Sequence, residues 1–219
     1  MTKNTNTLKI IACIAMVIDH TAAFLLNQKS MLELYIIMRF IGRLAFPLFA
    51  YCTVIGNSYT KNIKKYLIRL LIFACISQIP YFFLVNNPLD LNIIFTLLLG
   101  VILIRLFSSF KKNWQFIVIF IALYSLLCIL GVHFDYGVYG LLLMLLFQLL
   151  KDKKWWFEPL FIYLILASYL FLEWPQMASV FSILVLVNWR YKEIKLNKYF
   201  FYVFYPAHLI IIFIIKCFL

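Results

Sequence analysis

Long apolar runs separated by short polar connections make up almost the whole chain. The runs cover residues 8–26, 34–58, 66–85, 91–108, 114–131, 136–150, 156–172, 176–189 and 199–217. Most are long enough to cross about 30 Å of hydrocarbon as a helix. The connections are about 3 to 9 residues long, which leaves no room for a separate soluble domain. The pattern predicts an all-α polytopic membrane protein with about nine transmembrane helices, in which residues 1–219 form a single domain.

The amino-acid composition also indicates that most of the chain is surrounded by lipid. The chain is 66% hydrophobic and only 13% charged, a balance that water-soluble domains do not keep. The five cysteines stand singly inside apolar runs, so the sequence predicts neither a metal site nor a disulfide framework. No glycine-rich phosphate loop is present, which excludes a nucleotide-binding domain on this chain. We expect a multi-pass protein of the cell (cytoplasmic) membrane, with the lipid bilayer as its partner and no nucleic acid.

The net charge of +12 is unevenly distributed along the chain, and its distribution indicates the membrane topology. Sixteen of the twenty Lys and Arg residues lie on one side of the predicted topology, in or next to the amino terminus and every second connection: Lys3, Lys9, Lys61, Lys64, Lys65, Arg69, Arg105, Lys111, Lys112, Lys151, Lys153, Lys154, Arg190, Lys192, Lys195 and Lys198. The opposite connections are short and lean acidic. Since basic residues mark the cytoplasmic side, the amino terminus is predicted to be cytoplasmic and, with nine spans, the carboxyl terminus outside.

Charged groups inside apolar runs cost about 2.5 to 3.5 kcal/mol each and therefore indicate functional candidates. The first run holds Asp19 and His20, in its outer half if the topology is right. The second run places Arg39 and Arg43 one helical turn apart on one face. Either arginine could instead neutralise Asp19 in a structural ion pair.

Three further polar groups fall at similar depths. Asn92 and Thr96 are spaced i, i+4 in the fourth run, a spacing also typical of hydrogen bonding between helices. In the last run, Tyr205 and His208 flank a helix-kinking proline. Asp135 and Tyr136 lie in the predicted outer connection between the fifth and sixth runs, where a molecule from outside the membrane could enter. Together these positions predict a buried polar site.

At these same residues the chain resembles the TraX family, membrane proteins named for the conjugative pilin acetylase and regarded as relatives of the broad transmembrane acyltransferases. The segments that carry the resemblance are "LKIIACIAMVIDH", "RFIGRLAFPLFAY", "NIKKYLIRLLIFACISQIP", "NIIFTLLLG", "DYGVYGLL" and "FYVFYPAHLIII". The resemblance implies an enzyme, a membrane-embedded acyltransferase, which moves an acyl group, most simply acetyl, from cytoplasmic acetyl-CoA to an amine or hydroxyl. The acceptor would be a peptide amino terminus, a glycan or a lipid.

The polar residues fit such a reaction as a hypothesis. His20 is the first choice of general base, with Asp19 orienting it and His208 as a rival base or proton-shuttling partner. Arg43 or Arg39, with Asn92, would stabilise the oxyanion. The residues expected to bind substrate are Arg39, Asn92, Thr96, Asp135, Tyr136 and Tyr205.

Two other classes of protein are also compatible with the sequence. A small transporter or flippase would use the same groups as a relay at the membrane midplane, although no inverted repeat of two halves is visible. A non-catalytic assembly or immunity protein would use them only to fix helix packing. A homo-oligomer is compatible with either class and with the acyltransferase.

Overall fold

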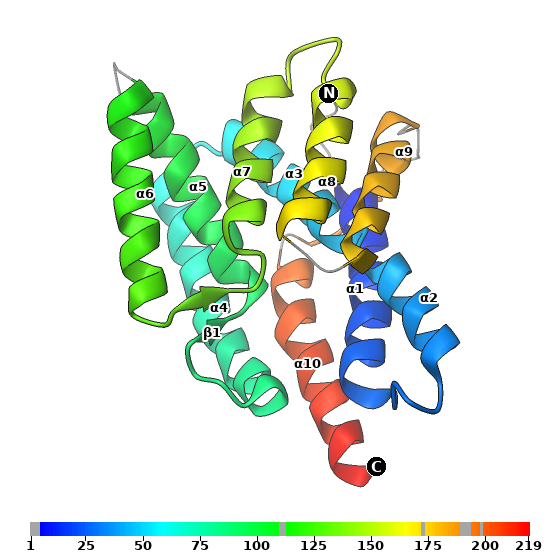
Figure 1. Ribbon diagram of the computed structural model, residues 1–219. Helices are drawn as coiled ribbons and strands as arrows, with labels where there is room; N and C mark the ends of the chain where they lie inside the picture. Colours follow the sequence, from blue (N-terminus) through cyan, green and yellow to red (C-terminus); the bar gives the residue numbers. More distant parts are fainter. Residues whose placement is uncertain (1–4, 110–112, 172–173, 189–193, 198) are drawn as a thin grey trace.

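A computed structural model describes residues 5–109, 113–171, 174–188, 194–197 and 199–219. Over these residues the protein is a bundle of helices, shown in Figure 1. The elements are α1 (Asn6–Leu25), α2 (Leu32–Gly42), α3 (Ala45–Tyr59), α4 (Ile63–Val85), β1 (Asp90–Leu91), α5 (Ile93–Ser109), α6 (Asn113–Ile129), β2 (His133–Phe134), α7 (Gly137–Leu150), α8 (Phe157–Phe171), the 3₁₀ helix η1 (Trp174–Phe181), α9 (Ser182–Val187) and α10 (Phe200–Phe218). The predicted all-α class is confirmed.

Several helices are able to span a membrane. By length and composition, four helical stretches qualify: Asn6–Leu25, Leu32–Tyr59, Ile63–Val85 and Phe200–Phe218. The other predicted runs form apolar helices of 10–17 residues. Large apolar side chains are exposed along the outside of the bundle, among them Ile14, Ile79 and Ile211, as is typical of a lipid-facing surface.

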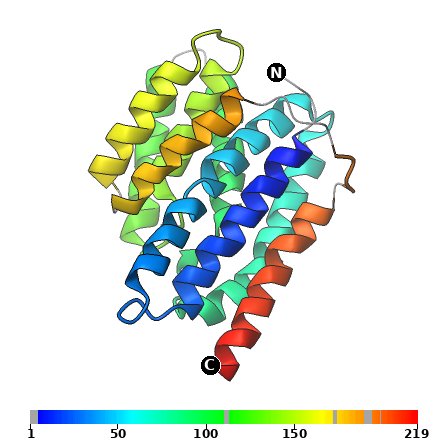
Figure 2. The same ribbon diagram turned by 90° about the vertical axis from the view of Figure 1, so that its right-hand side faces the viewer.

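The helices run up and down the bundle, and the two termini lie at opposite ends of it in both views (Figures 1 and 2). The amino-terminal end of the bundle also holds the α3–α4 and α7–α8 connections, with Lys61, Lys64 and Lys151. Part of the predicted basic set, namely Lys3, Lys111, Lys112, Arg190, Lys192 and Lys198, lies outside the described residues. We call the amino-terminal end the basic end.

Helix α3 is the centre of the bundle. It contacts α1, α5, α7 and α9, and all of its residues from Ala45 to Ile55 except Phe49 are buried. A helix that is apolar on all sides is stable only when other helices surround it. By contrast, α6 lies at the edge of the bundle and packs mainly on α5 (Figure 1).

Two predicted runs differ from single regular helices. The run 34–58 divides into α2 and α3 at a turn formed by Arg43 and Leu44. Its two halves still follow one another closely enough to count as one 28-residue apolar stretch. The run 176–189 begins in η1 and continues as the six-residue α9. A turn or a 3₁₀ segment can have the same apolar composition as an α-helix. Only the contacts in the folded structure therefore show where the regular helix is interrupted.

A small parallel bridge ties two connections together at the end of the bundle opposite the basic end. Asp90 and Leu91 of β1 pair with His133 and Phe134 of β2. The Asp135 amide also donates to the Leu91 carbonyl at 3.2 Å. The bridge fixes the backbone that leads into α7 and thereby positions Asp135 and Tyr136.

Candidate functional site

A polar pocket of about 170 Å³ lies between the carboxyl-terminal halves of α1, α2 and α4. Its lining is Met16, Asp19, His20, Ala23, Phe24, Arg39, Gly42, Arg43, Ala45, Tyr81, Ile93, Asp135 and Tyr136. We call it the polar pocket. It brings together six of the ten residues that the sequence singled out, from two helices, the α2–α3 turn and the β2–α7 connection.

Asp19 and Arg39 form an ion pair across the α1–α2 contact. Arg39 Nη1 donates to Asp19 Oδ2 at 2.8 Å, and both side chains are largely buried. The other carboxylate oxygen, Oδ1, is buried and accepts no hydrogen bond from the described residues. One carboxylate oxygen of Asp19 therefore binds Arg39, and the other can still accept a hydrogen bond.

The close approach of α1 and α2 depends on Gly42. A Cβ atom built there would overlap the side chain of Asp19. The backbone of α2 thus lies directly on the carboxylate, as small residues allow where helices meet in a membrane.

Arg43 lies where α2 ends and faces the same pocket. Its guanidinium interacts electrostatically with Tyr136, Asp19 and Asp135. Its Nε is buried and has no hydrogen-bond partner among the described residues. A buried donor of this kind costs about 1–3 kcal/mol unless something binds it. Arg43 is also hydrogen-bonded to the Tyr136 side chain, so it is held in the pocket while its Nε stays without a partner among the described residues.

His20 pairs with His208 and not with its neighbour Asp19. His20 Nδ1 lies 2.8 Å from His208 Nε2, and the two rings are stacked with centroids 5.0 Å apart. Helices α1 and α10, which come from opposite ends of the sequence, are joined at this contact. His208 itself is buried and does not line the polar pocket.

The hydrogen bonds assign the tautomers of both rings. His208 Nδ1 lies 3.1 Å from the Phe204 carbonyl, which can only accept, so this nitrogen carries the proton. In the neutral ring His208 Nε2 must then accept, and His20 Nδ1 must donate to it. The assignment leaves His20 Nε2, on the other side of the imidazole, as an unprotonated nitrogen. This is the nitrogen that a general base uses.

Asp135 and Tyr136 enter the pocket from the connection held by β1 and β2. Asp135 is exposed to the pocket, yet protein packed around the pocket displaces bulk water from the carboxyl group. This desolvation raises the pKa of Asp135 to about 7, while Arg43 acts in the opposite direction.

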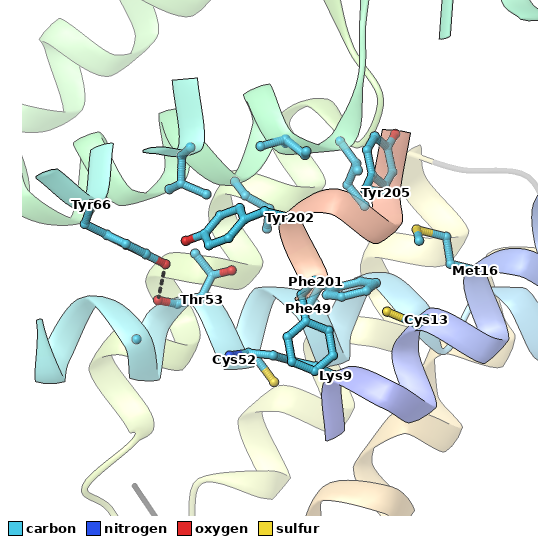
Figure 3. Close-up of a pocket in the computed structure, with 15 residues that line it drawn as sticks. Lys9, Cys13, Met16, Phe49, Cys52, Thr53, Tyr66, Phe201, Tyr202 and Tyr205 are labelled. Carbon is cyan, nitrogen blue, oxygen red and sulfur yellow. Dashed lines mark hydrogen bonds between the residues drawn. The ribbon is translucent and has the colours of Figure 1, made fainter. Parts of the chain in front are cut away.

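The remaining predicted residues lie outside the polar pocket. Asn92 is fully buried at the start of α5, where its amide donates to the Ala74 carbonyl at 2.9 Å and to Gln78 Oε1 at 2.8 Å. Thr96 is buried one turn further on, beside Gly140. These contacts join α5 to α4 and α7. Tyr205 lines a neighbouring pocket, with its ring centroid 6.5 Å from that of His20 (Figure 3).

Gly42 and Tyr81 are among the pocket residues that were not singled out from the sequence. Gly42 stands between the two arginines, and this spacing was the available signal. Tyr81 follows Pro80 inside α4, a position where a helix proline commonly marks an irregularity. Among the described residues, no group of three or more His, Cys, Asp and Glu side chains is arranged to hold a metal ion.

The fold and the pocket define a class: a helical membrane-type protein with an internal site of histidine, arginine and aspartate side chains. The chain belongs to the TraX protein family, whose profile matches residues 4–216. It is 31% identical to the "Probable fimbrial assembly protein FimC, serogroup H1" of Dichelobacter nodosus, over 97% of this chain and 95% of that protein.

A second relative is the "Uncharacterized protein RP591" of Rickettsia prowazekii (strain Madrid E). The two are 30% identical over 67% of this chain and 56% of that protein. No solved structure matches the chain. The family thus rests on sequence similarity along nearly the whole chain.

Proposed function

We propose that the protein is an acyltransferase of the cell membrane. In this proposal it crosses the bilayer about nine times with its basic end in the cytoplasm. It transfers an acyl group, acetyl in the simplest case, from acyl-CoA to an amine or hydroxyl of an acceptor outside. The observation that carries the proposal is the hydrogen-bonded chain from Phe204 through His208 to His20, which leaves an unprotonated nitrogen in a pocket that also holds Arg43.

The reaction needs two things from the pocket. The acceptor nitrogen or oxygen attacks the thioester carbonyl carbon while His20 Nε2 removes its proton. Negative charge then develops on the carbonyl oxygen, and the Arg43 guanidinium stabilises it in surroundings with little water. When the carbon–sulfur bond breaks, the CoA sulfur leaves with the electron pair and takes the proton from His20. The enzyme returns to its starting state without a covalent intermediate.

The other pocket residues hold the reacting groups in place. Asp19 neutralises Arg39 and, through the contact at Gly42, fixes the turn that carries Arg43. Asp135 and Tyr136 face the pocket from the acceptor side and would bind the incoming nucleophile.

The name of one relative supports a choice among the acceptor classes. The Dichelobacter relative is named for fimbrial assembly, and fimbriae are built from protein subunits. A peptide amino terminus is therefore the first acceptor to test, followed by glycan and lipid acceptors with hydroxyl groups.

The test is acetyl transfer by purified protein reconstituted in lipid vesicles. Acetyl-CoA carrying a labelled acetyl group is added together with pilin-type peptides or membrane extract, and released CoA thiol and labelled acceptor are measured. We expect His20→Ala to lower the rate by about 10²–10⁴-fold, the usual contribution of a general base. His133→Ala is the matched control, because this exposed histidine lies outside the polar pocket.

Equal rates for wild type and His20→Ala would eliminate His20 as the base. If folded wild-type protein neither binds CoA nor moves label, the transporter reading becomes the better one, and uptake of substrate into the vesicles should then depend on the same pocket.

A further inference from the structure

A second pocket of about 150 Å³ lies on the inner side of the polar pocket, between α1, α3, α4, α5 and α10 (Figure 3). It differs in character from the polar pocket, because most of its wall is apolar. Its side chains include Phe49, Leu70, Leu97 and Phe201, together with the thiols of Cys13 and Cys52. We call it the apolar pocket.

The two pockets are neighbours that share part of their walls. Met16 of α1 and Ile93 of α5 line both. Tyr205 lines only the apolar pocket, yet its ring lies beside that of His20. Only the side chains of Met16, Ile93 and Tyr205 therefore separate a molecule in the apolar pocket from the histidine pair.

The other end of the apolar pocket points toward the basic end of the bundle. Lys9, in the first turns of α1, lines the pocket with its ammonium 5.2 Å from the centroid of the Phe201 ring. Figure 3 shows Lys9 at one end of the pocket and Met16 and Tyr205 at the other. Seven residues of α1 separate Lys9 from Met16, about 10 Å along the helix axis.

We propose that the apolar pocket holds the pantetheine arm of the acyl donor, with the acyl thioester beside Tyr205 and the CoA phosphates among the lysines of the basic end. The inference rests on the proposed acyltransferase function and assigns its donor to a separate site. The arm is long and slender and carries two amides and a hydroxyl, for which Thr53, Tyr66 and Lys9 offer polar partners in an otherwise apolar passage. Lys61, Lys64 and Lys65 lie at that same end and attract phosphate groups.

The division into two pockets also explains how two substrates meet. The donor occupies the apolar pocket from the basic end, and the acceptor occupies the polar pocket from the opposite end. The thioester carbonyl carbon then lies at the wall that the two pockets share, where His20 and Arg43 act. Neither substrate has to leave before the other binds.

The first test narrows each pocket in turn and measures binding of labelled acetyl-CoA to the purified protein. Gly56 lines the apolar pocket, and a Cβ atom there would come within 3.3 Å of the Tyr66 hydroxyl, so Gly56→Leu fills part of the passage. Ala23→Leu makes the same change in the polar pocket. We expect Gly56→Leu to weaken acetyl-CoA binding at least tenfold and Ala23→Leu to leave it within a factor of two.

A second measurement uses the wild-type protein, so that it does not depend on a variant that folds. Cys13 and Cys52 line the apolar pocket, whereas Cys75, Cys128 and Cys217 are exposed elsewhere. Acetyl-CoA should slow the formation of mixed disulfides between the first two thiols and a small methanethiosulfonate reagent, followed by mass spectrometry. It should leave the other three unchanged.

The outcomes separate the two proposals. Binding with protection of Cys13 and Cys52 but no acetyl transfer would overturn the acyltransferase function and retain the donor pocket. Transfer that persists in Gly56→Leu at wild-type affinity, without protection of either thiol, would overturn the donor pocket and retain the function. Folded protein that binds no acetyl-CoA overturns both.

Discussion

At the scale of single residues, the site depends on which histidine nitrogen is free. His208 is a positioning residue, because its contact with the Phe204 carbonyl decides that His20 must donate through Nδ1. In the proposed reaction His20 then presents Nε2 as the base. An arrangement in which a second group fixes the tautomer of a base recurs in unrelated hydrolases.

This role predicts different results for two substitutions of His208. Glutamine can still accept the hydrogen bond from His20, whereas phenylalanine keeps the ring and removes the acceptor. We expect His208→Phe to lower kcat about 10²-fold or more and His208→Gln to lower it less than tenfold. The KM for acetyl-CoA should stay constant in both, since His208 lines neither pocket. Wild-type kcat in His208→Phe would contradict the assignment.

The same scale shows what the sequence could predict. Asp19, His20, Arg39, Arg43 and His208 could be found because charged or titratable groups inside apolar runs are costly. The sequence also offered an ion pair of Asp19 with either arginine and His208 as a shuttling partner, but it could not choose between these contacts and an Asp19–His20 pair. The structure shows Asp19 paired with Arg39 and His20 paired with His208.

At the scale of elements, the contact between α1 and α2 determines how the side chains of the polar pocket are arranged. Gly42 brings the two backbones together over Asp19, and the α2–α3 turn that follows aims Arg43 inward. Apolar periodicity could place these helices but not the turn between them. The bridge between β1 and β2 was equally hidden, since it pairs residues 43 positions apart in two-residue segments without a strand pattern.

A methyl group at position 42 tests this contact. Gly42→Ala would push Asp19 away from Arg39, and overpacking of this kind costs about 1–3 kcal/mol. We expect a lower melting temperature and a loss of transfer activity. Ile41→Ala is the control, because Ile41 is exposed on the outside of the bundle and its truncation should cost little. A Gly42→Ala protein with the stability and activity of wild type would show that the helices do not need this approach.

The placement of Asn92 shows the limit of reasoning from helix spacing. Asn92 and Thr96 share a face with the expected spacing, but that face turns toward α4 and α7 and not into the polar pocket. The order in which helices pack cannot be read from short connections, so depth in the membrane could be predicted and neighbours could not.

At the scale of the whole molecule, the bundle has two chemically different ends and a pocket reaching toward each. Most of the described lysines gather at the amino-terminal end, while Lys29, Lys216 and Asp135 lie toward the other. The pattern of basic residues could be predicted from sequence and gives the proposed orientation. The two pockets that meet at Met16 and Ile93 could not, because they depend on six helices packed together.

The most direct test of this account compares membrane vesicles of the two orientations. CoA does not cross bilayers, so acetyl-CoA added outside reaches only the exposed end of the protein. We predict that inverted vesicles, which expose the cytoplasmic end, transfer labelled acetyl to acceptor, and that right-side-out vesicles do so only after permeabilisation. His20→Ala vesicles should be inactive in both orientations. Transfer in intact right-side-out vesicles, with no activity in inverted ones, would contradict donor binding at the basic end.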